Sequence, residues 1–198
     1  MKALCIIAQA HGSDTPGKCS PDKSFYEWQW SREFTKMLIK GLDEIGVDSV
    51  IINPSEKEVG LVTQANNVNK MYASERGTYD EIFLLSPHVN AGNEFRWSSS
   101  SGFTAWVGTK AGKKSKRLGT IFGEIAEEMK LTGNRYIPRD KYWVGNFTIL
   151  NRTNCPAVLT ENMFQTNKKD VEFLKSDEGK KKLLDLHIEA VKRYLEEL

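Results

Sequence analysis

The stretch EIFLLSPHVNAG, residues 81–92, decides the fold because it joins an apolar strand to a polar loop. Its first part, Glu81–Ser86, predicts a strand, which the following proline is expected to end. His88 comes directly after that proline. The stretch IIAQAHGSD repeats the arrangement, since the predicted strand Ala3–Ala10 is followed by His11. Two strand-end histidines, among only three in the chain, suggest a shared metal ion.

The rest of the chain alternates short strands with amphipathic helices. Further strands are predicted at Ser49–Asn53, Gly102–Val107, Phe147–Leu150 and Ala157–Glu161. Apolar residues at helical spacing predict helices that run from Trp30 to Ile45, Leu61 to Tyr72, Leu118 to Met129 and Leu184 to Leu198. This alternation predicts a single α/β domain, with a twisted, mainly parallel sheet of about six strands flanked by helices on both faces.

Composition excludes several classes of protein. The 28 Lys and Arg residues nearly balance 26 Asp and Glu residues, which argues against a nucleic-acid-binding protein. Cys5, Cys19 and Cys155 are odd in number and widely spaced, so we expect reduced, structural thiols. No stretch approaches the roughly 18 apolar residues of a membrane span. The N-terminal residues do not resemble a secretory signal, so we expect synthesis in the cytoplasm and no membrane insertion.

Three polar residues are predicted to meet at one edge of the sheet. Open α/β sheets carry their sites at the carboxyl ends of strands, and His11, His88 and Glu161 all lie there. A single histidine after a strand is more often a hydrogen-bonded loop residue than a ligand, and both interpretations stay open. Glu161 ends an apolar strand, where an unpaired charge is costly unless a cation lies nearby.

Glu27 is the third candidate ligand, and it also has two interpretations. Ser24 and Glu27 match a helix capping box, in which the glutamate bonds back to the start of the helix. Glu27 also lies on the apolar face of its helix, three residues before Trp30, and from there its carboxylate can reach a metal. His11, Glu27 and His88 form the His₂Glu set typical of a catalytic zinc site. A metal-dependent hydrolase is therefore favoured.

The order of four motifs resembles that of the zinc-dependent N-acetylmuramoyl-L-alanine amidases of the amidase-3 family. The motifs are AHG at His11, YEWQ at Glu27, SPHVNAG at His88, and NCPAVLTENMF around Glu161. The strand SGFTAWVG and the closing segment from Gln165 also match the family pattern, so the resemblance covers nearly the whole chain.

This resemblance implies an enzyme and assigns roles to its residues. It implies that His11, Glu27 and His88 bind one Zn²⁺ per chain and that Glu161 is the catalytic carboxylate. The implied substrate is peptidoglycan, cut at the amide between the lactyl group of N-acetylmuramic acid and L-alanine of the stem peptide. Asn90 is expected to position either the substrate or its own loop. Residues 1–198 are expected to form one catalytic amidase domain with no separate wall-binding domain.

The chain departs from the family pattern at two places. Ala8-Gln9-Ala10 replaces the usual Asp-Pro-Gly before the first histidine, which affects the turn that holds His11. Asn162 and Met163 follow Glu161 where the family usually has small residues, which affects the pocket beside that carboxylate. Neither departure removes a proposed ligand.

Two rival functions remain. One is a zinc peptidase that cuts another bond of the stem peptide, and the other is a catalytically silent wall-binding module. Without an export signal, the predicted setting is cell lysis by a monomeric, phage-type endolysin released through a holin-type pore, or wall turnover inside the cell. His187 is expected to pack at the edge of the closing helix. Sugar-stacking candidates are Trp28, Trp97, Trp106 and Trp143.

Overall fold

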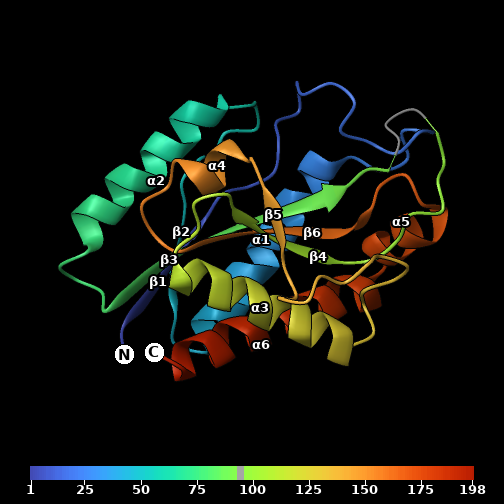
Figure 1. Ribbon diagram of the computed structural model, residues 1–198. Helices are drawn as coiled ribbons and strands as arrows, with labels where there is room; N and C mark the ends of the chain where they lie inside the picture. The colour runs from blue at the N-terminus through green and yellow to red at the C-terminus, as the bar shows by residue number, and fades with distance from the viewer. Residues whose placement is uncertain (93–95) are drawn as a thin grey trace.

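The protein is described here by a computed structural model that covers residues 1–92 and 96–198. Its centre is a six-stranded sheet in the order β2-β1-β3-β6-β4-β5 (Figure 1). The strands are β1 (Ala3–Ile7), β2 (Asp48–Ile51), β3 (Glu81–Asn90), β4 (Thr104–Gly108), β5 (Trp143–Gly145) and β6 (Ala157–Phe164). The first four strands in this order are mutually parallel, whereas β4 runs antiparallel to β6. The predicted mainly parallel α/β sheet is therefore confirmed.

Helices cover both faces of the sheet, as predicted (Figure 1). One face packs against α1 (Glu27–Glu44), α3 (Lys113–Glu128), α5 (Lys168–Lys175) and α6 (Asp177–Glu196), and the other against α2 (Leu61–Glu75) and α4 (Thr148–Asn151). The two faces are separated by the period-2 alternation of each strand. In β1, Cys5 and Ile7 join the core under α1, while Leu4 and Ile6 join the core under α2.

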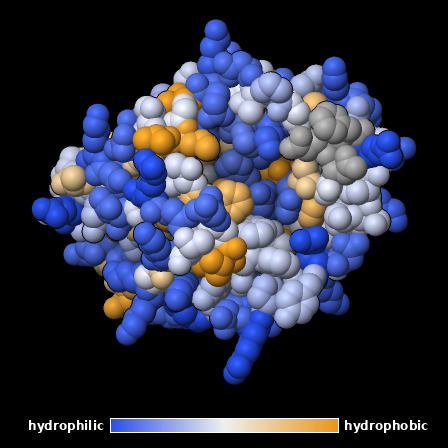
Figure 2. Space-filling model, turned by 45° about the horizontal axis from the view of Figure 1, so that its top comes forward, coloured by the Kyte–Doolittle hydropathy of each residue, from blue (hydrophilic) through white to orange (hydrophobic). Residues whose placement is uncertain are grey.

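The surface outside these two cores is mostly hydrophilic. Figure 2 shows a face on which hydrophobic residues form a few separate patches. Large apolar side chains that remain exposed include Leu61, Val62 and Tyr136. Within the described ranges, no helix combines the length and the apolar character needed to cross a bilayer. The three cysteines are free thiols, as predicted.

The strand β3 continues past the point where the proline was expected to end it. The Leu85 carbonyl accepts a hydrogen bond from the Ala8 amide, just beyond β1. Pro87 lies two residues later, so its nitrogen faces the same side of the strand, toward β1. The β1 ladder has already ended at the pair Ile7 and Leu85. Pro87 therefore costs no ladder hydrogen bond, and pairing with β6 continues as far as Asn90. This continuation keeps His88 inside the sheet.

The expected strand Phe147–Leu150 is wrong. Residues 148–151 form the short helix α4, and the sixth strand is β5, five residues earlier. A short apolar run cannot be assigned to strand or helix by periodicity alone. The helix α5 was also not predicted; it begins at Lys168 and is capped by Asn167, whose side chain accepts hydrogen bonds from the Lys169 and Asp170 amides.

His187 does not pack at the edge of its helix but is fully buried. Its Nδ1 donates to the Leu183 carbonyl at 2.8 Å, so its Nε2 accepts from the Thr160 hydroxyl at 3.0 Å. The rings of Phe34, Phe103 and Phe122 surround it. Burial lowers the pKa of His187 to about 4, and the side chain is therefore neutral in the core.

Candidate active site

His11 lies just beyond the carboxyl end of β1, in a tightly held turn. Its backbone is in the left-handed region, with φ of 46°. The preceding residue is fixed because the Ala10 amide donates to the Ser31 hydroxyl of α1 at 2.9 Å. The following residue, Gly12, packs directly on the backbone of Glu58, where any side chain would collide. The Ala8-Gln9-Ala10 segment thus still directs His11 toward the sheet edge.

Glu27 is the first residue of α1, and its side chain is buried. The capping-box interpretation is wrong, because the N-cap is Tyr26 and no side chain caps this helix. The carboxylate instead crosses to β3, where Oε1 accepts from the Val89 amide at 2.9 Å and lies 3.1 Å from Nδ1 of His88. Its Oε2 lies 3.6 Å from Nε2 of His11. Glu27 therefore connects the two histidines.

The three predicted ligands form one cluster. One potential ligand atom from each of His11, Glu27 and His88 lies within 4.8 Å of the others. The two imidazole rings are perpendicular, with centroids 5.0 Å apart. Two histidine nitrogens and a carboxylate at this spacing match the donor set of a zinc site that keeps one position open. The residues present therefore fit a zinc ion.

The charges in the cluster depend on one another. Burial lowers the pKa of His11 to about 4, which the Glu27 charge offsets only in part. Burial also acts to lower the pKa of His88, but the hydrogen bond and charge of Glu27 outweigh it and raise that pKa. Burial would raise the pKa of Glu27, yet contact with His88 and the nearby His11 lower it. A charged Glu27 and a neutral His11 are the ligand states that a divalent cation requires, and binding of the cation would displace the proton from His88.

Glu161 lies beside the cluster in the middle of the sheet. It pairs with His88 of β3 on one side and with Thr104 of β4 on the other. Among the described residues, its buried Oε2 atom has no hydrogen-bond partner. Burial raises the pKa of Glu161 to about 8, although the His88 charge acts in the opposite direction. A carboxyl group with this pKa can take up and release a proton near neutral pH.

Asn162, the residue after Glu161, holds the backbone of His88. The buried side-chain amide of Asn162 donates to the His88 carbonyl at 3.0 Å and to the Thr160 hydroxyl at 3.1 Å. The next residue, Met163, has φ of 64°, and the pairing with β3 shifts register between His88 and Asn90. Asn162 and Met163, where the chain departs from the family pattern, thus lie at this irregularity, and Asn162 holds the backbone of His88.

Asn90 ends β3 and does not line the pocket described below. Its side-chain oxygen accepts from the amide of Ala91, and its carbonyl accepts from the Gln165 amide. The structure thus gives Asn90 a local role in the loop that follows β3. Contact between Asn90 and substrate stays a prediction.

A pocket of about 240 Å³ opens beside the two histidines, on the face covered by α2 and α4. His11 and His88 form part of its wall, and Phe147, Thr148 and Ile149 form another part. The mispredicted segment therefore borders the site as helix α4. Its remaining lining residues are Gln9, Glu58, Leu61, Gln64, Ser86, Asn146 and Leu159.

Glu58 is a site residue that sequence reasoning missed. Its Oε2 lies 3.8 Å from Nδ1 of His11 and accepts from the Thr15 hydroxyl at 3.0 Å. Its Oε1 accepts from the Gln64 side-chain amide at 2.7 Å. Glu58 lies in the irregular connection between β2 and α2, so neither strand nor helix periodicity could assign its direction. Its position beside His11, a candidate ligand, would orient that ring.

Arg32 was also missed, and it connects the same two loops. From α1, its Nη1 donates to the Ala10 carbonyl at 3.1 Å, and its Nη2 donates to the Ser55 carbonyl at 2.9 Å. The helical pattern of α1 shows that Arg32 lies off the apolar stripe, but not which backbone carbonyls it meets.

Comparison with known proteins gives a consistent result. A relative from Bacillus licheniformis, "N-acetylmuramoyl-L-alanine amidase CwlM", is 29% identical over 135 residues, 68% of this chain and 46% of the relative. The chain thus spans about half the length of that curated relative.

Solved structures show the same fold. The N-acetylmuramoyl-L-alanine amidase from Clostridium difficile 630 superposes with a TM-score of 0.80 at 24% identity, covering 98% of this chain and 97% of the other. The amidase Ami1 from Mycobacterium smegmatis also gives 0.80, at 16% identity, covering 100% and 98%. These likenesses confirm the predicted single-domain α/β fold.

The family model described as "N-acetylmuramoyl-L-alanine amidase" matches residues 5–193, which include all four motifs found in the sequence. This match confirms the enzyme family that those motifs predicted. The chain therefore belongs to the Amidase_3 family of N-acetylmuramoyl-L-alanine amidases.

Proposed function

We propose that this chain is a zinc-dependent amidase that hydrolyses the bond between the lactyl group of N-acetylmuramic acid and L-alanine of the peptidoglycan stem peptide. The observation that carries the proposal is the meeting of His11, Glu27 and His88 beside Glu161, in a chain of the Amidase_3 family. A hydrolase needs a group that activates water and a group that moves a proton. This cluster offers both.

The metal is proposed to be one Zn²⁺ per chain, held by His11, Glu27 and His88. Zinc supplies a water of lowered pKa and polarises the scissile carbonyl when it is bound. The chain's own contribution is to fix the three donors before binding. The Val89 amide fixes Glu27, Asn162 fixes the backbone of His88, and the packing of Gly12 fixes that of His11.

Glu161 is proposed to be the catalytic carboxylate. Its Oε2 takes a proton from the attacking water as the water oxygen forms a bond to the amide carbon. The same proton then passes to the amide nitrogen, the carbon–nitrogen bond breaks, and L-alanine leaves with a free amino group. Burial, which raises the pKa of Glu161, makes this carboxylate a stronger base than an exposed glutamate.

The pocket beside His11 and His88 is proposed to receive the substrate next to the scissile amide. The wall formed by α4 and the residue before it presents Ile149 and Phe147, which suit the aliphatic part of a short peptide. Asn90 is proposed to act at the rim of the site through the loop that it stabilises.

The proposal is tested by identifying the bond that the purified chain cleaves. Muramyl peptides of known structure are incubated with the zinc-loaded chain, and the products are identified by mass spectrometry and amino-terminal labelling. The expected products are a free lactyl carboxylate and a peptide that begins with L-alanine. Removal of the metal with a chelator should abolish the reaction, and added Zn²⁺ should restore it.

The two rival functions give different results in this experiment. A zinc peptidase would release a new amino terminus at another position of the stem peptide and leave the lactyl amide intact. A silent wall-binding module would bind peptidoglycan and release nothing. The second rival is the less favoured, because a binding module has no use for a buried carboxylate with an unpaired oxygen.

The biological setting is a further part of the proposal. A lytic role like that of an endolysin, release through a holin-type pore and a monomeric state are the expectations drawn from the sequence. Co-expression with and without a pore-forming holin, followed by turbidity measurements, tests the lytic role. Lysis that depends on both the pore and Glu161 would support it, and an unchanged turbidity would oppose it.

A further inference from the structure

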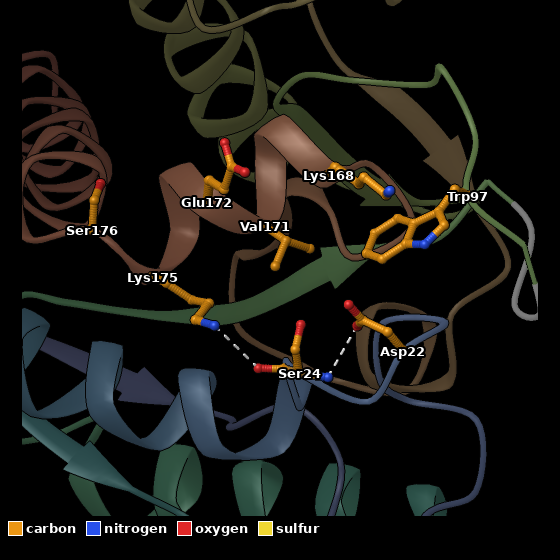
Figure 3. Close-up of a pocket in the computed structure, with 8 residues that line it drawn as sticks. All are labelled: Asp22, Ser24, Trp97, Lys168, Val171, Glu172, Lys175 and Ser176. Carbon is orange, nitrogen blue, oxygen red and sulfur yellow. Dashed lines mark hydrogen bonds between the residues drawn. The ribbon is translucent and has the colours of Figure 1, made fainter.

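A second pocket lies on the opposite face of the sheet from the first, between α5 and the loop that precedes α1. Its volume is about 570 Å³, and it shares no lining residue with the pocket beside the histidines. The lining residues are Asp22, Ser24, Trp97, Lys168, Val171, Glu172, Lys175 and Ser176 (Figure 3). Nothing in the proposed reaction at Glu161 uses these residues.

The walls of this pocket are chain neighbours of the candidate active site. The loop with Asp22 and Ser24 leads directly into Glu27, and α5 follows the strand that carries Glu161. Trp97 belongs to the segment that follows β3 and His88. The walls of the pocket therefore come from the same three chain segments that carry Glu27, His88 and Glu161.

Trp97 forms one end of the pocket. Figure 3 shows its indole ring between the side chains of Lys168 and Asp22, with Lys168 Nζ 5.5 Å from the ring centroid. The ring is half-buried, and its inner part packs against the core. A fixed indole with an accessible surface is the group that packs against the carbon–hydrogen face of a pyranose ring.

Asp22 places a hydrogen-bond acceptor beside that ring. Its Oδ1 accepts from the Ser20 hydroxyl at 2.7 Å and from the Ser24 amide at 3.0 Å, which fixes the carboxylate. The Asp22 side chain is exposed, so its carboxylate can also accept from a ligand. The hydrogen bond from Ser20, followed by those from Ser24, lowers the pKa of Asp22 to about 2, so it is ionised at neutral pH.

The charges of the pocket balance. Two ammonium groups, from Lys168 and Lys175, and two carboxylates, from Asp22 and Glu172, line it, and Lys175 Nζ donates to the Ser24 carbonyl at 3.4 Å (Figure 3). A nucleotide or another strongly anionic ligand would meet two carboxylates here. A neutral ligand with many hydroxyl and amide groups can use both kinds of charged group as hydrogen-bond partners.

The other sugar-stacking candidates have different surroundings. Trp28 carries the guanidinium of Arg32 against its ring, at 5.5 Å from the centroid. Trp106 packs on Trp143 and on Phe147, with centroids 5.4 and 5.5 Å apart. The cavity beside Trp143 measures about 10 Å³, which is too small for a sugar ring. Trp97 is therefore the candidate with room for a ligand.

We infer that the pocket of Asp22, Trp97 and α5 is a saccharide subsite that holds one sugar unit of the peptidoglycan glycan strand. The inference rests on the proposed function for the identity of the polymer. The sugar packs on Trp97, one of its hydroxyl groups donates to Oδ2 of Asp22, and Lys168 donates to a ring substituent. The subsite holds the polymer while the stem peptide enters the first pocket.

Binding is tested with glycan strands from which the stem peptides have been removed, by titration calorimetry with the zinc-loaded chain. Trp97→Ala should weaken binding by at least about tenfold, Trp97→Phe by less, and Asp22→Asn by several-fold. Trp143→Phe is the matched control and should bind as the wild type does. Far-ultraviolet circular dichroism and the melting temperature check that each variant is folded.

Kinetics provide a second readout. Trp97→Phe and Asp22→Asn should raise KM for polymeric peptidoglycan and leave kcat unchanged, while cleavage of a single-sugar muramyl peptide stays at the wild-type rate. The inference is overturned if Trp97→Ala and Asp22→Asn bind stripped glycan as tightly as the wild type. It is also overturned if the wild type binds isolated stem peptide but not stripped glycan, and Trp97→Ala weakens that peptide binding. Binding of glycan without amide cleavage would leave this subsite standing and refute the proposed function alone.

Discussion

Gly12→Ala is expected to disable the site without changing any polar group. The added Cβ would lie 2.6 Å from Cα of Glu58 and closer still to its backbone nitrogen, whereas ordinary contact begins at 3.4 Å. The atoms in the way are backbone atoms, which cannot turn aside. The closest approach, to the Glu58 nitrogen, is 1.9 Å, so the loop that carries His11 must separate from the 55–58 segment by about 1 Å even to reach 3.0 Å, the lower limit of real Cβ contacts.

The magnitude follows from that displacement. A shift of about 1 Å in a group that positions the reacting atoms costs roughly 100-fold in rate. Zinc affinity should fall by about tenfold to 100-fold, because the displaced loop moves His11, a proposed ligand, away from the contacts that position it. The strain should also lower the free energy of unfolding by about 1–3 kcal/mol.

The assay measures muramyl peptide hydrolysis, zinc affinity by competition with a chromogenic chelator, and urea unfolding. Gly77→Ala is the matched control, because an added Cβ there meets no atom within 4 Å and the backbone has no positive φ. Gly77→Ala should match the wild type in all three measurements. Wild-type activity and zinc affinity in Gly12→Ala would refute the argument that this close approach positions His11.

Two further predictions concern Glu58, which the sequence did not reveal, and His187, whose full burial it did not reveal. Glu58→Gln keeps one of the two acceptor oxygens that meet Thr15 and Gln64, replaces the other by an amide nitrogen and removes the charge near His11, so zinc affinity should fall by about tenfold; an unchanged affinity in the chelator assay would exclude the positioning role. His187 has a folded pKa of about 4, below its usual 6.5, so its stabilisation is complete above pH 6.5 and is lost as the pH falls toward 4. Between pH 7 and 4, the free energy of unfolding of the metal-free wild type should fall by about 3 kcal/mol more than that of metal-free His187→Gln. Urea unfolding at the two pH values measures both losses, and equal losses would contradict the assignment of this pKa to His187.

Much of the fold was predictable because long elements carry strong periodic patterns. The apolar stripes of α1, α3 and α6 are helical over many residues, and β1 and β6 read as buried runs. The parallel order then brings the carboxyl ends of β1, β3 and β6 to one edge. That edge is why His11, His88 and Glu161 could be expected to lie together from the sequence.

The wrong predictions share a physical cause. In each case, contacts with residues distant in the sequence decide the local structure. Residues 148–151 form a helical turn because they pack against α2, and their pattern alone fits a strand equally well. Pro87 stays in its strand because the neighbouring strand ends before it. His187 is buried because Thr160 and the Leu183 carbonyl satisfy both ring nitrogens. The sequence shows none of these partners locally.

Metal content and bond cleavage, measured together on the wild type and on Glu161→Ala, test the central claim most directly. The chain is purified, its zinc is quantified, and new L-alanine amino termini are counted after incubation with peptidoglycan. We predict about one zinc ion per chain in both proteins and L-alanine ends from the wild type alone. Full cleavage by Glu161→Ala, or cleavage by a wild-type chain that binds no zinc, would contradict the account.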